Sequence, residues 1–218
     1  MEKVIQEWYE DKKNVDEMFD WNKANNKIKI WEQEVIKVFP EKASILDIGC
    51  GKGREAFALS DMNFSVVGID ISEEVINQVT KSSAQNGYSI SFQVYDGHSL
   101  PFDDESFQVI IIWSQTFGLL QGDNYKQEFL KECKRVLKKD GILSFSGHDA
   151  RYLQEHYMQY INGRKFYPYA NAEIYWETFL PEELSDYAKN AGFSVILCEE
   201  GEIYKPEDGV VLHCLCKK

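Results

Sequence analysis

Three glycines stand on alternate positions directly after an acidic residue in the segment "ILDIGCGKG", residues 45–53. Asp47 comes first, followed by Gly49, Gly51 and Gly53. Glycine adopts positive φ without strain and lets a ligand lie against bare backbone. A dinucleotide turn has the spacing G-x-G-x-x-G and holds a pyrophosphate, whereas the spacing here is G-x-G-x-G. Because a carboxylate repels a pyrophosphate and attracts a cation, the turn favours a ligand with an ammonium or sulfonium group over NAD.

Two further acids stand at the ends of the next predicted strands. Asp70 closes "SVVGID" and Asp96 closes "ISFQVYD". A carboxylate at the end of the second strand accepts hydrogen bonds from both hydroxyls of an unphosphorylated ribose, and one after the third strand can accept from an exocyclic amine such as that of adenine. The ordered set predicts a ligand with a cationic group, a ribose and a base. The competing interpretation is ordinary turn chemistry, since Asp and Gly are common in loops.

The chain around these residues alternates between short apolar runs and helical patterns. We predict strands at 44–49, 65–70, 90–96, 107–114 and 142–149, and helices at 54–62, 72–87 and 124–141. This alternation indicates βαβ units, that is, a parallel sheet with helices on both faces. Ligands of such sheets bind beyond the carboxyl ends of the strands. A helix at 181–192 and two antiparallel strands at 193–200 and 210–218 are expected to complete the chain.

Two segments fall outside this alternation. Residues 1–40 have the pattern of amphipathic helices that end at Pro40, and residues 147–180 are rich in aromatic side chains. We expect residues 1–218 to form a single domain, with 1–40 as a helical lid and 147–180 as an insertion that covers a substrate. The competing interpretation is a hydrophobic cluster that only roofs the sheet.

The composition narrows the class of protein. The 218 residues carry a formal net charge of -12 and no cluster of Lys and Arg, which argues against nucleic acid as a partner. No apolar run approaches the roughly 18 residues of a membrane span, and the charged opening has no apolar leader. The five cysteines lack the spacing of a zinc site. We predict no metal, reduced thiols and a cytoplasmic location.

Four segments together resemble the class I S-adenosylmethionine-dependent methyltransferases, especially the branch that acts on small molecules. "ILDIGCGKG" is similar to the first motif of that family and "VVGIDIS" to its acidic ribose loop. "YDGHSLPFDDESFQVI" and "RVLKKDGIL" are similar to its adenine loop and its late helix-turn-strand motif. They follow in the family's order over residues 40–147, and the antiparallel tail extends the match to most of the chain. Two departures are Gln108 in place of the usual Asp and Lys139-Asp140-Gly141 in place of Pro-Gly-Gly.

The resemblance implies an α/β fold with a Rossmann-like, seven-stranded, mostly parallel sheet, an antiparallel C-terminal strand and helices on both faces. It implies S-adenosylmethionine as the cofactor and S-adenosylhomocysteine as the product. Asp47 is expected to hold the ammonium group, Asp70 the ribose hydroxyls and Asp96 the adenine edge. The residues expected to bind the cofactor are Asp47, Gly49, Cys50, Gly51, Gly53, Asp70, Ile71, Asp96, Gly97, His98, Trp113 and Ser114.

Methyl transfer from a sulfonium is an in-line displacement, so the protein contributes mainly by aligning the nucleophile and excluding water. A base is needed only when the nucleophile keeps its proton at pH 7. His148, after the fifth strand, is the candidate catalytic base, and the competing interpretation is a structural histidine at a strand end. The residues expected to face the acceptor are Tyr9, Gln115, Phe117, Tyr169, Tyr175 and Trp176.

These residues together predict a cytoplasmic methyltransferase for a small-molecule acceptor, acting as a monomer or homodimer without nucleic acid or membrane partners. Methylation of a protein or peptide side chain is an alternative that an open acidic groove would favour. A non-catalytic S-adenosylmethionine-binding protein is another, which predicts binding without turnover. A nicotinamide-dependent dehydrogenase is the last alternative.

Overall fold

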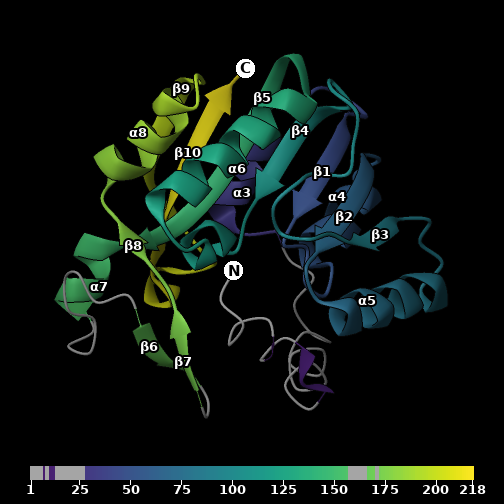
Figure 1. The fold of residues 1–218 in the computed structure, drawn as a ribbon, viewed down its shortest axis with the longest axis horizontal. Helices are drawn as coiled ribbons and strands as arrows, with labels where there is room; N and C mark the ends of the chain where they lie inside the picture. Colours follow the sequence, from purple (N-terminus) through teal and green to yellow (C-terminus); the bar gives the residue numbers. More distant parts are fainter. Residues whose placement is uncertain (1–6, 8–9, 13–27, 157–165, 170–171) are drawn as a thin grey trace.

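A central sheet organises the computed structural model, which describes residues 7, 10–12, 28–156, 166–169 and 172–218 (Figure 1). In these residues, seven strands follow the order β3-β2-β1-β4-β5-β10-β9. Their bounds are β1 Ser44–Ile48, β2 Ser65–Asp70, β3 Ser91–Val94, β4 Phe107–Ile112, β5 Leu137–Asp149, β9 Ser194–Glu202 and β10 Val210–Lys217. Strands β1 to β5 pair in parallel, and β10 pairs antiparallel with both β5 and β9. This order confirms the predicted mostly parallel sheet with antiparallel pairing near the C-terminus.

Three short strands come from the aromatic insertion. β8 (Thr178–Phe179) extends the sheet by pairing in parallel with the last two residues of β5. β6 (Phe166–Tyr169) and β7 (Ala172–Tyr175) form a separate antiparallel pair. The insertion therefore returns to the sheet at the carboxyl end of β5, the edge of the sheet at which the predicted site residues lie.

Helices cover both faces of the sheet (Figure 1). The helices are α3 Ile30–Ile36, α4 Arg54–Asp61, α5 Glu73–Gln85, α6 Asp123–Val136, α7 Ala150–His156 and α8 Pro181–Asn190, with the 3-10 turns η2 Thr116–Leu119 and η3 Pro206–Asp208. Along β4, Ile110 and Ile112 pack in one core with residues of α6 and α8, while Val109 and Ile111 pack in another with residues of α3 and α4. Because successive side chains of a strand point to opposite faces, the two cores lie on opposite sides of the sheet.

The sequence pattern overestimates one helix. We expected a helix up to residue 141, but α6 ends at Val136 and β5 begins at Leu137. Leu137 is fully buried and pairs with Phe107 at the start of β4, and Asp140 has φ of 62°, a left-handed conformation that does not occur within an α-helix. The prediction for residues 137–141 is wrong for this reason.

The N-terminal region contributes a core helix. Trp31 and Val35 of α3 are each 2% exposed and pack against the sheet, and Phe39 joins the same cluster. Residues 30–39, which we expected to form part of a lid, thus cover one face of the sheet. The predicted helices in residues 13–27 lie outside the described residues. Within the described part of the chain, no helix has the length and apolar character needed to span a bilayer.

Candidate functional site

The glycine-rich turn connects β1 to α4 at the carboxyl end of the sheet. Gly49, Gly51 and Gly53 have φ of 74°, 50° and 80°, in the left-handed region that favours glycine. A Cβ on Gly49 would lie 2.5 Å from Cγ2 of Thr116, so this position has no room for a side chain. A Cβ on Gly51 would meet nothing within 4 Å. The backbone at Gly51 therefore borders open space in which a ligand can lie.

Asp47 lies near the end of β1, directly before this turn. It is 2% exposed, and its Oδ2 has no hydrogen-bond partner among the described residues. Burial, followed by repulsion from Glu55, raises the pKa of the Asp47 carboxyl well above its usual value. A buried carboxyl oxygen without a partner destabilises the protein, and a bound cation would remove that penalty.

Asp70 ends β2 and holds the glycine turn from the neighbouring strand. Gly51 N donates to its Oδ2 at 3.0 Å, and Ser72 N donates to its Oδ1 at 3.1 Å. Burial raises the pKa of Asp70, and these hydrogen bonds offset part of that rise. Each carboxylate oxygen can accept a second hydrogen bond, so Asp70 keeps acceptor capacity. A Cβ on Gly97 would lie 3.5 Å from Cγ2 of Ile71, which puts the turns after β2 and β3 side by side.

The turn after β3 is closed by its own hydrogen bonds. Oδ1 of the exposed Asp96 accepts from the backbone N–H of Ser99 at 2.8 Å and of His98 at 2.7 Å. These two hydrogen bonds lower the pKa of Asp96. Tyr125 of α6 donates to the carbonyl oxygen of Gly97, and its ring centre lies 5.2 Å from that of His98. The structure therefore brings Asp96, Gly97 and His98 together in one turn that α6 supports.

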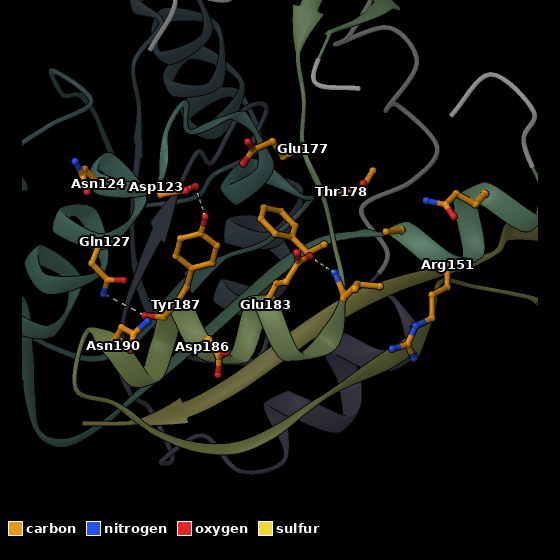
Figure 2. A pocket seen from close by; sticks show the side chains of 14 residues that line it. Asp123, Asn124, Gln127, Arg151, Glu177, Thr178, Glu183, Asp186, Tyr187 and Asn190 are labelled. Atoms are coloured by element: carbon orange, nitrogen blue, oxygen red, sulfur yellow. Dashed lines mark hydrogen bonds between the residues drawn. The ribbon is translucent and has the colours of Figure 1, made fainter. Parts of the chain in front are cut away.

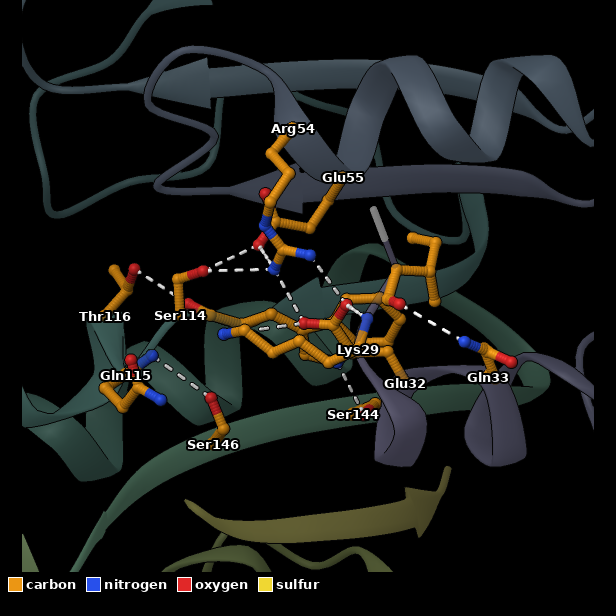
Figure 3. A network of polar contacts seen from close by, with 12 residues as sticks. Lys29, Glu32, Gln33, Arg54, Glu55, Ser114, Gln115, Thr116, Ser144 and Ser146 are labelled. Carbon is orange, nitrogen blue, oxygen red and sulfur yellow. Dashed lines mark hydrogen bonds and ion pairs between the residues drawn. The ribbon is translucent and has the colours of Figure 1, made fainter. Parts of the chain in front are cut away.

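A buried network of charges stands at the start of α4 (Figure 3). Arg54 donates through Nη1 and Nη2 to the two oxygens of Glu32 in α3, at 2.8 and 2.6 Å, and it also pairs with Glu55. Burial acts to raise the pKa of Glu55, but attraction by Arg54 and Lys29 outweighs it and lowers the pKa. Glu55 in turn accepts from the hydroxyl of Ser114 at 2.7 Å. The network thus ties the end of β4 to helices α3 and α4.

The chain leaves β4 through two consecutive left-handed residues. Ser114 has φ of 52° and Gln115 has φ of 63°, a conformation that costs a residue with a side chain roughly 1–2 kcal/mol. The hydroxyl bond from Ser114 to Glu55 holds the first of them. Gln115 N donates to Oγ of the buried Ser146 at 3.1 Å and holds the second. Backbone strain that surrounding groups maintain in this way clusters at functional sites, and Ser114 is exposed there.

His148 stands near the end of β5, beside β4 in the sheet. It pairs with Thr178 of β8, and its ring centre lies 3.6 Å from that of Trp176, at an interplanar angle of 72°. Both side chains are partly exposed. Burial, with a smaller contribution from Lys29, lowers the pKa of His148 well below 6.5. The imidazole is therefore neutral at pH 7, so a ring nitrogen is free to accept a proton, and the lowered pKa makes it a weaker base than an ordinary histidine.

Known proteins are similar to this chain in sequence and in fold. A putative methyltransferase of Bacillus subtilis, YqeM, is 32% identical over 120 residues, 55% of this chain and 48% of that protein, so the chain spans about half the length of that relative. A ubiquinone biosynthesis O-methyltransferase of Pelagibacter ubique is 26% identical over 205 residues, 88% of this chain and 81% of that protein. The crystal structure of a SAM-dependent methyltransferase from Methanosarcina mazei has the same fold, with a TM-score of 0.74, 21% identity, and coverage of 85% of this chain and 96% of that one.

A family model described as a methyltransferase domain matches residues 45–141, from β1 into β5. The matched segment contains the glycine turn and the ends of β2, β3 and β4. Residues 45–141 therefore match a methyltransferase domain, and the sheet around them has the fold of S-adenosylmethionine-dependent methyltransferases. The cofactor of this family is S-adenosylmethionine, which is a cation because its sulfonium and ammonium outweigh its carboxylate.

The residues of this site fit that cofactor. Asp47 offers an unpartnered buried oxygen, Gly51 offers open backbone and Asp70 offers acceptor capacity. Six charged side chains interact around Asp47 and Glu55. Four of them are carboxyls, Glu32, Asp47, Glu55 and Asp70, and two are basic, Lys29 and Arg54. The excess of carboxyls favours a positively charged ligand.

Four of the predicted contact residues have side chains inside the methyltransferase core. Trp113 is 1% exposed and donates its indole N–H to Oγ of Ser144 at 2.8 Å, so its side chain is enclosed in the core. Phe117 and Tyr175, expected to face the acceptor, are buried, because burying large aromatic rings removes much apolar surface from water. The Cys50 thiol is buried as well, which leaves only the backbone of that residue for ligand contact.

The other predicted acceptor residues have different outcomes. Gln115 and Trp176 are partly exposed, and Trp176 contacts His148. Tyr9 lies outside the described residues. For Tyr169, the structure describes only the backbone, in β6.

Sequence reasoning missed the residues that support the site. Arg54 and Glu55 directly follow the glycine turn, and their charges at the start of an otherwise apolar helix were the available signal. Glu32 and Ser146 come from α3 and β5, far from the turn along the chain, and no local pattern links them to it. Their contacts with Arg54 and Gln115 exist only in the folded protein.

Proposed function

We propose that this protein transfers the methyl group of S-adenosylmethionine to a small-molecule acceptor by direct displacement. Bound S-adenosylmethionine supplies a methyl group on a sulfonium, which is an activated leaving group. The proposal rests on the Asp47 carboxyl, which is buried with an unpartnered oxygen beside the open backbone at Gly51. A cationic amino acid group suits this pair of features, and a pyrophosphate does not.

Each part of the site has a task in this reaction. Asp47 accepts a hydrogen bond from the ammonium of the cofactor, and Asp70 accepts from the ribose hydroxyls. The strained turn at Ser114 and Gln115 borders the space where the acceptor approaches. Aligning reactants and excluding water is worth up to about 7–11 kcal/mol in well-oriented reactions. His148, neutral at pH 7 because burial lowers its pKa, takes the proton of the acceptor onto a ring nitrogen.

A small molecule is the acceptor that the surroundings favour. His148 and Trp176 lie edge to face at the end of β5, where the insertion returns to the sheet. The Pelagibacter relative, which aligns over 88% of this chain, is named as a ubiquinone biosynthesis O-methyltransferase. A hydroxyl on a small aromatic compound is therefore the first acceptor to test. The five free cysteines support a cytoplasmic location, where thiols stay reduced.

Binding and turnover test the proposal in two steps. Calorimetric titration of the purified protein with S-adenosylmethionine, S-adenosylhomocysteine and NAD is expected to show binding of the first two. Tight binding of NAD and none of S-adenosylmethionine would refute the proposal. Asp70→Ala is expected to weaken cofactor binding sharply, while the exposed Asp103→Asn serves as a control of equal charge change.

The acceptor assay uses cofactor labelled in the methyl group and metabolite extracts. Transfer of label to a small organic product supports the proposal. Transfer to proteins or peptides would instead identify a protein methyltransferase. Cofactor binding with no transfer to any extract fraction would favour a non-catalytic binding protein.

A further inference from the structure

Lys126 is a charged residue that lies inside the protein, away from the glycine turn. It stands in the first turn of α6 with no exposed surface, and its ammonium pairs with the carboxylate of Glu177. Three aromatic ring centres lie 5.8–5.9 Å from its Nζ, those of Tyr175, Phe179 and Tyr187. Burying an ion pair carries a large desolvation penalty, and apolar residues of similar size often stabilise a fold at least as well. The pair is therefore better explained by the position in which it holds Glu177 relative to α6 than by a gain in stability.

Glu177 belongs to residues 175–179, which we call the strap because they bring the insertion back to the sheet. Its carboxylate accepts from the hydroxyl of Tyr175 as well as pairing with Lys126. Its backbone N–H donates to the carbonyl oxygen of Gly118 in η2 at 3.0 Å. A Cβ on Gly118 would lie 2.8 Å from the carbonyl oxygen of Glu177, so the strap lies directly on η2. Three ties thus converge on one residue of the strap.

The neighbours of Glu177 in the strap reach the predicted base. Trp176, directly before it, has its ring centre 3.6 Å from that of His148. Thr178, directly after it, pairs with His148 between β8 and β5. The position of Glu177 therefore sets the position of both groups that contact His148.

Part of the strap borders a cavity on its other side. A cavity of about 730 Å³ lies there, between α6, α7 and α8, and Glu177 and Thr178 form part of its wall (Figure 2). Opposite them, the cavity is lined by polar residues of α6 and α8, including Asp123, Gln127 and Tyr187. Phe179, the last residue of the strap, is 3% exposed and packs in the core against Phe117 and Tyr187. Glu177 and Thr178 border the cavity instead, so the ion pair with Lys126 adds a tie at the middle of the strap, where less packing is available.

We propose that Lys126 and Glu177 are positioning residues, whose ion pair anchors the strap to α6 and thereby holds Trp176 against His148 on the acceptor side of the active site. This inference rests on the proposed function, because the acceptor is placed beside His148 by that proposal. Neither residue contacts the reacting groups. Both act through Trp176 and Thr178.

The test removes both charges together. Lys126→Met alone leaves the Glu177 carboxylate buried without its ammonium and is expected to lower the melting temperature. The double variant Lys126→Met/Glu177→Gln leaves no unpaired charge and is expected to melt near the parent temperature. Lys131→Met is the matched control, because Lys131 is on the same helix and its pair with Glu128 is on the surface, with side chains 53% and 70% exposed.

Two measurements follow the strap without an acceptor. Protons of His148 lie within the ring current of Trp176 in the parent protein, so their NMR resonances are expected to be displaced and to return toward ordinary histidine values in the double variant. Exchange of the Glu177 amide hydrogen is expected to become at least about tenfold faster, since its bond to Gly118 opens more often. A folded double variant with unchanged His148 resonances and unchanged exchange would overturn the inference.

Turnover separates positioning from a purely structural role. The double variant is expected to bind S-adenosylhomocysteine as the parent does, while kcat with the acceptor found by the labelling assay falls by about 10- to 100-fold, as for other misplacements on the scale of 1 Å. If the NMR and exchange measurements show that the strap is released in the double variant, and its kcat still equals that of the parent, the positioning role is overturned. If the parent protein binds no S-adenosylmethionine, the proposed function is refuted instead. The NMR and amide-exchange measurements do not depend on that binding, so the two failures can be told apart.

Discussion

Replacing Asp47 with asparagine exchanges one carboxyl oxygen near the end of β1 for an amide nitrogen and removes the carboxylate that we propose binds the ammonium of the cofactor. Its Oδ2 is buried and unpartnered among the described residues, so it is expected to accept a charge-assisted hydrogen bond when the cofactor binds. Such a bond contributes about 1.5–3 kcal/mol, and about 1.4 kcal/mol corresponds to a tenfold change in affinity. We therefore expect Asp47→Asn to weaken S-adenosylmethionine binding by roughly 10- to 100-fold.

The same substitution is expected to stabilise the ligand-free protein at pH 7. Burial and Glu55 raise the pKa of Asp47 in the folded state above its value in the unfolded chain, so between these two values the folded protein binds more protons than the unfolded chain. The stability of the parent therefore falls as the pH rises above the unfolded-state value near 4. Asparagine does not ionise and escapes this loss. The melting temperature of the variant should exceed that of the parent at pH 7, and the difference should vanish below about pH 4.

Calorimetry with two ligands checks the reasoning. The affinity of the parent for S-adenosylmethionine is expected to rise with pH through the pKa of Asp47, because the cation favours the ionised carboxylate, and to lose most of that dependence in Asp47→Asn. Methylthioadenosine lacks the amino acid end and should bind both proteins equally. Asp103→Asn controls for the change in net charge. Equal S-adenosylmethionine affinity in variant and parent, or equal weakening of both ligands, would refute the assignment of Asp47 to the ammonium.

Three other perturbations address separate parts of the site. Gly51→Ala puts a methyl group into open space, so it is expected to weaken cofactor binding at a stability loss of about 1–2 kcal/mol. Gly49→Ala puts a methyl group 2.5 Å from a side chain and should lower the melting temperature much more. Similar behaviour of the two variants would contradict this reasoning. His148→Gln is expected to lower turnover by about 100-fold or more with unchanged cofactor affinity. In the parent, turnover should show no acidic fall near pH 6.5, because burial lowers the pKa of His148 well below that value. A fall there would contradict the lowered pKa, and turnover in His148→Gln equal to that of the parent would refute its role as the base. Ser144→Ala removes the acceptor of the Trp113 indole and should lower the free energy of unfolding by about 1–3 kcal/mol in denaturant titrations without affecting cofactor binding.

The order of strands and helices could be predicted because it depends on local periodicity. The parallel strands ending at Ile48 and Asp70 are short apolar runs between helical patterns, which indicates βαβ units and a parallel sheet. The boundary between α6 and β5 could not be predicted in this way. Residues 137–141 have a sequence compatible with a helix, and only the pairing of Leu137 with Phe107 makes them a strand.

The candidate site shows the same division. Asp47, Gly51 and Asp70 were predictable because parallel strands end at one edge of the sheet, which brings their C-terminal residues together. The support from Glu32 and Ser146 was not, because a hydrogen bond between segments far apart in the chain leaves no periodic signal. These residues hold the charge network and the strained turn after β4.

By itself, the sequence determined the kind of ligand, since the glycine spacing and the acids that follow the strands depend on residue type and position alone. Only the tertiary structure decided which aromatic residues lie in the core and which one contacts His148. Trp113 and Phe117 lie in the core, whereas Trp176 contacts His148 because Lys126 and Gly118 hold the adjacent Glu177. The physical reason is that aromatic side chains gain free energy in any apolar surroundings. Their direction is set by the packing of neighbouring elements, which the order of residues along the chain does not reveal.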